Sequence, residues 1–298
     1  MTGVLPIITA DQRMAEPRGI KGVIFGPSGI GKTSLLWTLK ASSTLFFDLE
    51  AGDLAIEGLA IDAIRPRTWT ECRDFAVFIG GPNPALRDEQ AYSSAHYAAV
   101  CQKFGDPAAL DKYDTVFIDS ITVAGRLCFG WCKGQPEAYS EKTGKPDVRG
   151  AYGLHGREMI AWLTHLQHTR GKNIWFVGIL DQKPDDFNRK VFSPQIDGSK
   201  TGLELPGIVD QVITMTDIAD GDGSPQRGFV CQTLNPWGFP AKDRSGRLDL
   251  IEPPHLGQLM DKIRGPLVSA ESRLTYQPPK LPAPSPAQAT TPSNDTTN

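Results

Sequence analysis

One eight-residue stretch near the N-terminus constrains the fold more than any other part of the chain. Residues 26–33 read Gly-Pro-Ser-Gly-Ile-Gly-Lys-Thr and match the pattern G-x-x-x-x-G-K-[ST] at every position. The apolar run 23–25 precedes this stretch, and residues 34–39, which we predict to be helical, follow it. In a strand–loop–helix context, backbone N–H groups and a helix N-terminus can surround phosphate groups. We therefore expect a loop that binds ATP or GTP.

The motif assigns roles to its two polar end residues. Lys32 would place its ammonium group on the β- and γ-phosphates, and the Thr33 hydroxyl would join the ligand shell of a Mg²⁺ ion. ATP and Mg²⁺ are therefore the expected cofactors. The expected nucleotide-binding residues are Gly26, Pro27, Ser28, Gly29, Ile30, Gly31, Lys32, Thr33 and Ser34.

Strand-like and helix-like stretches alternate over the first 205 residues. They lie at 23–25, 44–49, 70–79, 115–118, 158–167 and 174–180. This alternation predicts an α/β fold whose mostly parallel central sheet is flanked by helices. Two further strand-like runs, 209–216 and 228–234, are separated by a turn-rich segment. They predict an antiparallel extension of the sheet on its C-terminal side.

Composition divides the chain into three expected segments. An N-terminal extension covers residues 1–18, the α/β core covers 19–265, and a Pro-rich tail covers 266–298. Seven prolines lie between Pro266 and Pro292, among Ala, Ser, Thr and Asn. Such a tail cannot bury enough apolar surface to offset its ordering entropy, so we expect disorder from about residue 270. A flexible tether that binds a partner is the alternative.

Cysteine content indicates the cellular compartment, whereas net charge does not decide whether the protein binds nucleic acid. A formal net charge of -3 neither indicates nor excludes a nucleic-acid partner, because single loops can carry positive potential. The five scattered cysteines fit a reducing cytoplasm better than a disulfide framework. No apolar run of membrane-spanning length and no signal-peptide core are present, so we expect no membrane partner and a cytoplasmic protein.

Two acidic residues follow strand-like runs and complete the expected site. Asp119 ends the run 115–118, where it would hold Mg²⁺ directly or through water. Many ATPases place a water-polarising glutamate directly after this aspartate, but here that residue is Ser120. Glu50, just past the run 44–49, could instead reach the water in line with the γ-phosphate. The alternative is that Glu50 only caps the following turn.

The phosphate loop, the run F-F-D-L-E-A and the run V-F-I-D-S occur in that order, and together they resemble the RecA superfamily. The chain is most similar to small phage-encoded ATP-binding proteins with a bare RecA core, including the single-strand-annealing and recombinase type. This resemblance covers about residues 18–264. It implies a RecA-like P-loop NTPase core, Mg²⁺-dependent ATP hydrolysis with Glu50 as the catalytic glutamate, and, for a phage protein, a location in the host cytoplasm.

The resemblance also implies roles for residues far from the phosphate loop. The strand at 174–180 resembles the one that ends in a γ-phosphate sensor, which would be Gln182, with Asp181 as the rival. Lys242 and Arg244 resemble a lysine-x-arginine finger that reaches the γ-phosphate of a neighbouring subunit. A homo-oligomer with ATP at its subunit interfaces would follow.

Two loops would face single-stranded DNA in a protein of this type. They map to 126–149 and 183–200, where basic residues outnumber acidic ones by five to three and four to three, with aromatic residues interleaved. The expected work is DNA recombination, annealing or repair, and a single-strand-binding protein is a possible partner. The alternatives are a nucleotide-gated binding module with little hydrolysis, a P-loop kinase, and a ring helicase or helicase loader.

Overall fold

The structure is a computed structural model that describes residues 7–184, 188, 190–219 and 224–266. Most of the expected Pro-rich tail therefore lies outside the described residues. Within them, none of the helices has the length and apolar composition needed to cross a membrane.

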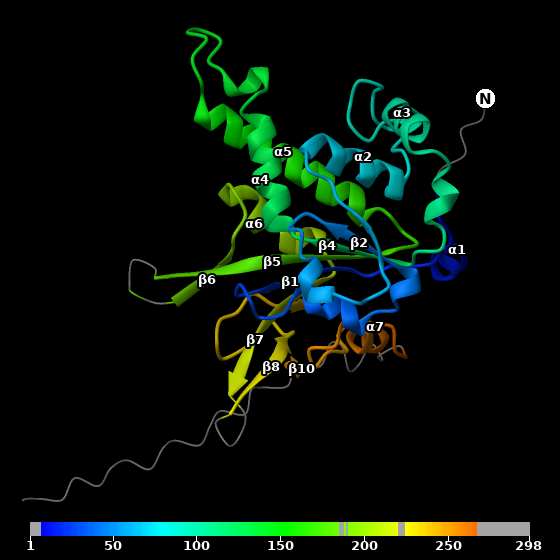
Figure 1. Ribbon diagram of the computed structural model, residues 1–298, viewed down its shortest axis with the longest axis vertical. Coiled ribbons are helices and arrows are strands. Elements are labelled where there is room, and N and C mark those ends of the chain that lie inside the picture. Colours follow the sequence, from blue (N-terminus) through cyan, green and yellow to red (C-terminus); the bar gives the residue numbers. More distant parts are fainter. Residues whose placement is uncertain (1–6, 185–187, 189, 220–223, 267–298) are drawn as a thin grey trace, which may run out of the picture. The chain divides into compact units, whose positions relative to one another are not determined.

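A mixed sheet forms the centre of the fold, with the strand order β10-β8-β7-β1-β5-β4-β2-β3 (Figure 1). The strands from β7 to β3 in this order run parallel, whereas β8 and β10 continue the sheet antiparallel beyond β7. Two short strands lie off this path, β6 on β5 and β9 on β7. The strands are β1 (Lys21–Gly26), β2 (Thr44–Asp48), β3 (Asp62–Ile64), β4 (Thr115–Asp119), β5 (Asn173–Pro184), β6 (Lys190–Pro194), β7 (Gln211–Ala219), β8 (Pro225–Val230), β9 (Lys242–Asp243) and β10 (Ile251–Glu252). The predicted α/β fold, with its mostly parallel sheet and antiparallel extension, is confirmed.

Helices lie on both faces of the sheet, α2, α4 and α5 on one face and α7 on the other (Figure 1). The α-helices are α1 (Ala10–Ala15), α2 (Trp69–Gly80), α3 (Ser94–Phe104), α4 (Ile121–Cys132), α5 (Val148–Gln167), α6 (Ser199–Ile208) and α7 (Leu256–Ile263). The 3₁₀ helices are η1 (Thr33–Thr38), η2 (Ala41–Ser43), η3 (Asp53–Ile56), η4 (Pro107–Leu110) and η5 (Pro136–Ala138).

Successive residues of the buried strands feed two separate apolar clusters. In β1, Val23 and Phe25 pack into the cluster that contains Trp162 of α5, while Ile24 packs into the one that contains Leu36 of η1. Side chains alternate between the two faces of a strand, so a strand covered on both faces needs apolar residues throughout. This is why the predicted strands appear in the sequence as unbroken apolar runs.

The segment after the phosphate loop is helical, as predicted, and its helix is of the 3₁₀ type. Residues 34–39 were expected to continue as a helix, and η1 is a six-residue 3₁₀ helix with i→i+3 bonds such as Leu39 N–H to Leu36 O. The Thr38 hydroxyl donates to Leu35 O at 2.6 Å and so occupies a carbonyl inside the turn. Short hydroxyl side chains that bond to local backbone favour such tight turns over α-helix.

Candidate nucleotide-binding site

The phosphate loop leaves the sheet at the end of β1 and needs glycine for two different reasons. Gly29 and Gly31 adopt positive φ angles of 80° and 99°, a backbone conformation that residues with a side chain rarely adopt. Gly26 is extended, but a Cβ placed on it would lie 2.5 Å from the carbonyl oxygen of Met215 in the neighbouring strand β7. The glycines of the motif therefore allow both the turn and the close contact with β7.

Lys32 closes the loop on itself. Its Nζ donates to the carbonyl oxygens of Gly26 at 3.0 Å and Pro27 at 2.8 Å. Burial lowers the pKa of Lys32, while the nearby carboxylates of Asp119 and Glu50 oppose this shift. The ammonium thus lies inside the loop at the position where the motif predicts a phosphate contact.

Asp119 and Thr33 meet at the carboxyl end of β4. The Thr33 hydroxyl donates to Asp119 Oδ2 at 2.5 Å, and Asp119 is 2% exposed. Burial raises the pKa of Asp119 to about 6, and the Thr33 hydrogen bond acts in the opposite direction. One carboxylate and one hydroxyl are oxygen ligands that suit Mg²⁺, which takes its remaining ligands from phosphate and water. The donor set therefore fits the expected ion.

Nowhere in the described residues does a group of three or more His, Cys, Asp or Glu side chains form a metal site of its own. Cys128 and Cys132, for example, lie one turn apart in α4 with their sulfur atoms 4.0 Å apart.

Glu50 lies at the same edge of the sheet and is held from two directions. Its side chain accepts a hydrogen bond from the Ser120 hydroxyl. Its backbone N–H donates to Asp48 Oδ1 at 3.2 Å, and the same oxygen accepts from Gly52 N–H at 3.3 Å. Because β2 pairs with β4 so that Asp48 lies opposite Asp119, the two strand ends bring Glu50 close to Asp119. The carboxylate that caps the turn after β2 is therefore that of Asp48 and not that of Glu50.

Three supporting residues around Glu50 were not identified from the sequence. Asp48 is 2% exposed, and its Oδ2 accepts from Arg65 Nε at 3.1 Å. Ser120 is the N-cap of α4 and accepts from Val123 N–H while it donates to Glu50. A serine between a strand and an apolar helix is a recognisable N-cap signal. No local sequence pattern predicts the contact between Arg65 and Asp48, because Arg65 follows a different strand, β3.

The candidate sensor residues lie on the extended end of β5. Gln182 is exposed and pairs with Phe192 of β6 in an antiparallel hairpin. Asp181 forms an ion pair with Lys183 at 3.0 Å and lines a cavity of about 410 Å³ together with Arg126. In the pairing of β1 with β5, Gly26, the first residue of the phosphate loop, lies opposite Ile179. Gln182 is three residues further along β5, beyond the end of β1.

Lys242 and Arg244 both reach the C-terminal end of α6 in the same chain. Lys242 Nζ donates to the carbonyl oxygens of Pro206 and, at 2.9 Å, Val209. Arg244 forms an ion pair with Asp210 at 2.9 Å. The last carbonyl groups of a helix have no partner within the helix, and cations are favourable there. In this single chain, the pair stabilises the end of α6.

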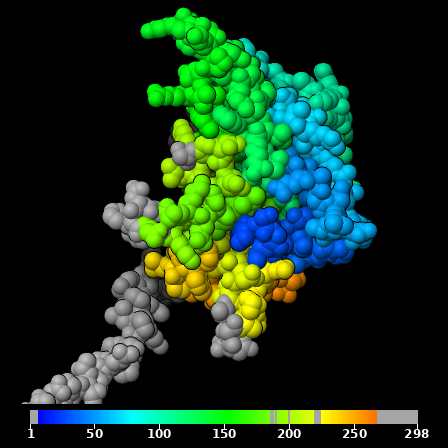
Figure 2. All heavy atoms as spheres, turned by 60° about the vertical axis from the view of Figure 1, so that its left-hand side comes forward, coloured from blue at the N-terminus to red at the C-terminus, as the bar shows by residue number. Residues whose placement is uncertain are grey.

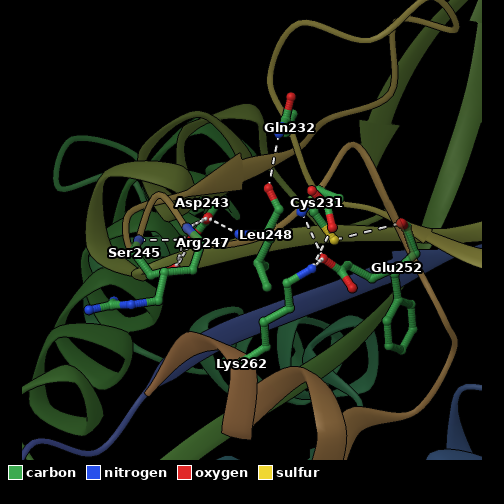
Figure 3. Close-up of polar contacts among 10 residues, drawn as sticks. Cys231, Gln232, Asp243, Ser245, Arg247, Leu248, Glu252 and Lys262 are labelled. Atoms are coloured by element: carbon green, nitrogen blue, oxygen red, sulfur yellow. Dashed lines mark hydrogen bonds and ion pairs between the residues drawn. The ribbon is translucent and has the colours of Figure 1, made fainter. Parts of the chain in front are cut away.

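The turn after Lys242 is built around Asp243 (Figure 3). Its carboxylate accepts from the backbone N–H groups of Ser245, Arg247 and Leu248 at 2.8 to 2.9 Å. Asp243, which lies between the two candidate finger residues, therefore fixes the backbone of the turn that follows Arg244.

The two loops expected to face DNA are partly built into the fold. The segment between α4 and α5 stands out from the surface (Figures 1 and 2). Phe129 stacks on Tyr152 with ring centroids 4.4 Å apart, and Phe192 packs on Phe239 at 4.5 Å. Residues 185–187 and 189 of the second loop lie outside the described residues.

A family model described as an AAA domain matches residues 18–245. The comparison with curated protein sequences found no match. Among solved structures, the assembled ATPase EscN from the type III secretion system of enteropathogenic E. coli has 18% identity and a TM-score of 0.31. The match covers 66% of this chain and 43% of the EscN chain, so this chain spans less than half of that protein's length.

Proposed function

The chain belongs to the AAA domain family, and we propose that it is an ATP hydrolase that hydrolyses MgATP between the phosphate loop, Asp119 and Glu50. The observation that carries this proposal is the meeting of Lys32, Thr33, Asp119 and Glu50 at one edge of the sheet. A triphosphate cradled by the loop would place its γ-phosphate beside two carboxylates with different partners. One is bonded to the metal-binding hydroxyl and the other to Ser120.

In the proposed reaction, Glu50 orients a water molecule in line with the γ-phosphate and accepts its proton as the new P–O bond forms. The bond between the γ-phosphorus and the β,γ-bridging oxygen breaks, and ADP leaves. Ser120 holds one oxygen of the Glu50 carboxylate, so the other can accept from water. Lys32 stabilises the charge on the β- and γ-phosphates. A Mg²⁺ ion held by Thr33 and Asp119 would neutralise further phosphate charge.

We also propose that the active form is a homo-oligomer in which Lys242 and Arg244 act on the nucleotide of the neighbouring subunit. Both cations lie on one short segment that Asp243 fixes, and Arg244 is about half exposed. In the single chain they bind the end of α6, so each would exchange these partners for phosphate oxygens in the oligomer. A guanidinium and an ammonium suit the charge that develops on the γ-phosphate.

Mixing two inactive variants tests this arrangement. A Lys242→Ala subunit beside a Glu50→Gln subunit forms one intact site, so an equal mixture should recover up to about a quarter of the wild-type rate. The measurement is steady-state phosphate release before and after mixing. As a control, Glu50→Gln mixed with Lys32→Ala should recover nothing, because both lesions lie in the same subunit's half of the site. No recovery with Lys242→Ala would contradict the finger.

For the cellular role, we propose that the ATPase binds single-stranded DNA in recombination, annealing or repair, alongside a single-strand-binding protein. Support comes from the order of motifs in the sequence and from exposed cations around the two loops. Lys142 and Lys145 are exposed on the segment between α4 and α5, and Arg149 is exposed at the start of α5. Lys183 and Lys200 are exposed at the two ends of the second loop. Exposed cations can bind the phosphate backbone of a strand. A ring helicase would share these features, and a strand-displacement assay separates the two roles.

The DNA proposal predicts that single-stranded DNA raises the ATPase rate by about fivefold or more and that added salt reduces this stimulation. Light scattering in the same samples gives the subunit number. Lys142→Ala with Lys145→Ala should lose most of the stimulation. Lys40→Ala with Lys112→Ala, a matched pair away from the two loops, should keep it. An ATPase rate that is unchanged by DNA would contradict the proposal.

A further inference from the structure

An arginine from the antiparallel extension lies over the phosphate loop. A Cβ placed on Gly31 would lie 2.8 Å from Arg227 Nη1 and 3.6 Å from its guanidinium carbon. Gly31 directly precedes Lys32, in the part of the motif where backbone N–H groups face the phosphates. A side chain from β8, nearly 200 residues away in the sequence, therefore reaches the centre of the motif.

The sheet pairing explains how Arg227 arrives there. β7 runs beside β1, pairing Thr214 with Phe25, and then continues past the end of β1 along the loop. β8 pairs with this continuation, so that Met215 lies opposite Phe229. Phe229 packs into the apolar cluster that contains η1, and Arg227, two residues earlier, lies on the same face.

Arg227 is available for a ligand. Arg227 is exposed, and among the residues that the structure describes its side chain has no hydrogen bond or ion pair. Asp217 lies directly opposite it in the β7–β8 pairing, at a position where an arginine would ordinarily find a carboxylate. The guanidinium instead lies at Gly31. A cation that lies by a phosphate loop without a carboxylate partner has its full charge available to an anion.

We propose that Arg227 binds the phosphate chain of the nucleotide held by the loop of its own subunit. The planar guanidinium can donate two hydrogen bonds to phosphate oxygens and is always charged. It would supply a second cation besides Lys32 in a site that otherwise holds the carboxylates of Asp119 and Glu50. Gly31, whose positive φ of 99° already favours glycine, also leaves space for the arginine side chain beside the loop. It rests on the nucleotide-binding part of the proposed function, not on the hydrolytic step.

Titration calorimetry with MgATP, MgADP and adenosine tests this assignment. Replacing Arg227 with Ala should raise the Kd for MgATP and MgADP about tenfold, because a charge-assisted contact to phosphate is lost. Arg227→Lys should restore part of the affinity. Adenosine, which has no phosphate, should bind both proteins equally. The control Asp217→Asn, which changes the opposite residue on the same face, should leave the Kd for MgATP within about twofold of wild type.

Two results would overturn the assignment. One is an Arg227→Ala protein that binds MgATP as tightly as wild type. The other is an equal loss for MgATP and adenosine together with a lower melting temperature, which would indicate that Arg227 only supports the loop. Failure of the hydrolytic proposal gives a different result, since wild type would then bind MgATP in the same titration without releasing phosphate.

Discussion

Replacing Glu50 with Gln is expected to lower ATP turnover by about two to four orders of magnitude, because a positioned general base contributes that much to proton transfer. The affinity for MgATP should stay within about twofold of wild type. Gln keeps the length of the side chain and can still accept the hydrogen bond from Ser120, but its amide cannot take a proton from water. The variant therefore separates binding from chemistry.

Two measurements check this expectation, phosphate release for turnover and calorimetry for affinity. Glu57→Gln is the matched control, because Glu57 is an exposed glutamate a few residues further along the same connection. We expect its rate to equal that of wild type. Turnover by the Glu50→Gln protein at the wild-type rate would remove Glu50 from the reaction and leave the water without an assigned base.

Replacing Lys32 with Ala is expected to weaken MgATP binding by about two orders of magnitude, because the half-buried ammonium that the motif assigns to the β- and γ-phosphates is lost. The loop itself also depends on this group, since Lys32 Nζ bonds to the carbonyl oxygens of Gly26 and Pro27. Calorimetry should show little heat when MgATP is added. Lys40→Ala, an exposed lysine beyond η1, is the control and should bind as wild type does.

The loop's own stability has to be measured in the same experiment. A melting temperature for Lys32→Ala within a few degrees of wild type would show that the lost affinity comes from the phosphate contact. Tight MgATP binding by a folded Lys32→Ala protein would contradict the assigned role of residues 26–33.

The parts of the fold that were predictable from the sequence depend on local patterns. β1, β2 and β4 were recognisable because strands buried on both faces must be apolar throughout. The meeting of Asp119 and Glu50 followed from the same reasoning, since the carboxyl ends of parallel strands share one edge. Helical spacing predicted a helix after the phosphate loop but not its type, which is 3₁₀ in η1.

Contacts between segments that are distant in the sequence could not be predicted from local patterns. Lys242 and Arg244 were predicted to act between subunits, whereas their attachment to the end of α6 depends on the pairing of β9 with β7. Arg227 went unrecognised because an arginine in a polar hairpin resembles any solvated residue. Its place beside Gly31 exists only because β8 folds back along β7.

By itself the sequence determined that this chain forms a parallel α/β core with a phosphate loop at the end of its first strand. Glycine spacing and strand burial are local requirements that a single sequence records. Only the tertiary structure decided which side chains support Glu50 and which cation lies over the loop. Those contacts join strands that are adjacent in the sheet but far apart in the chain, so no local pattern encodes them.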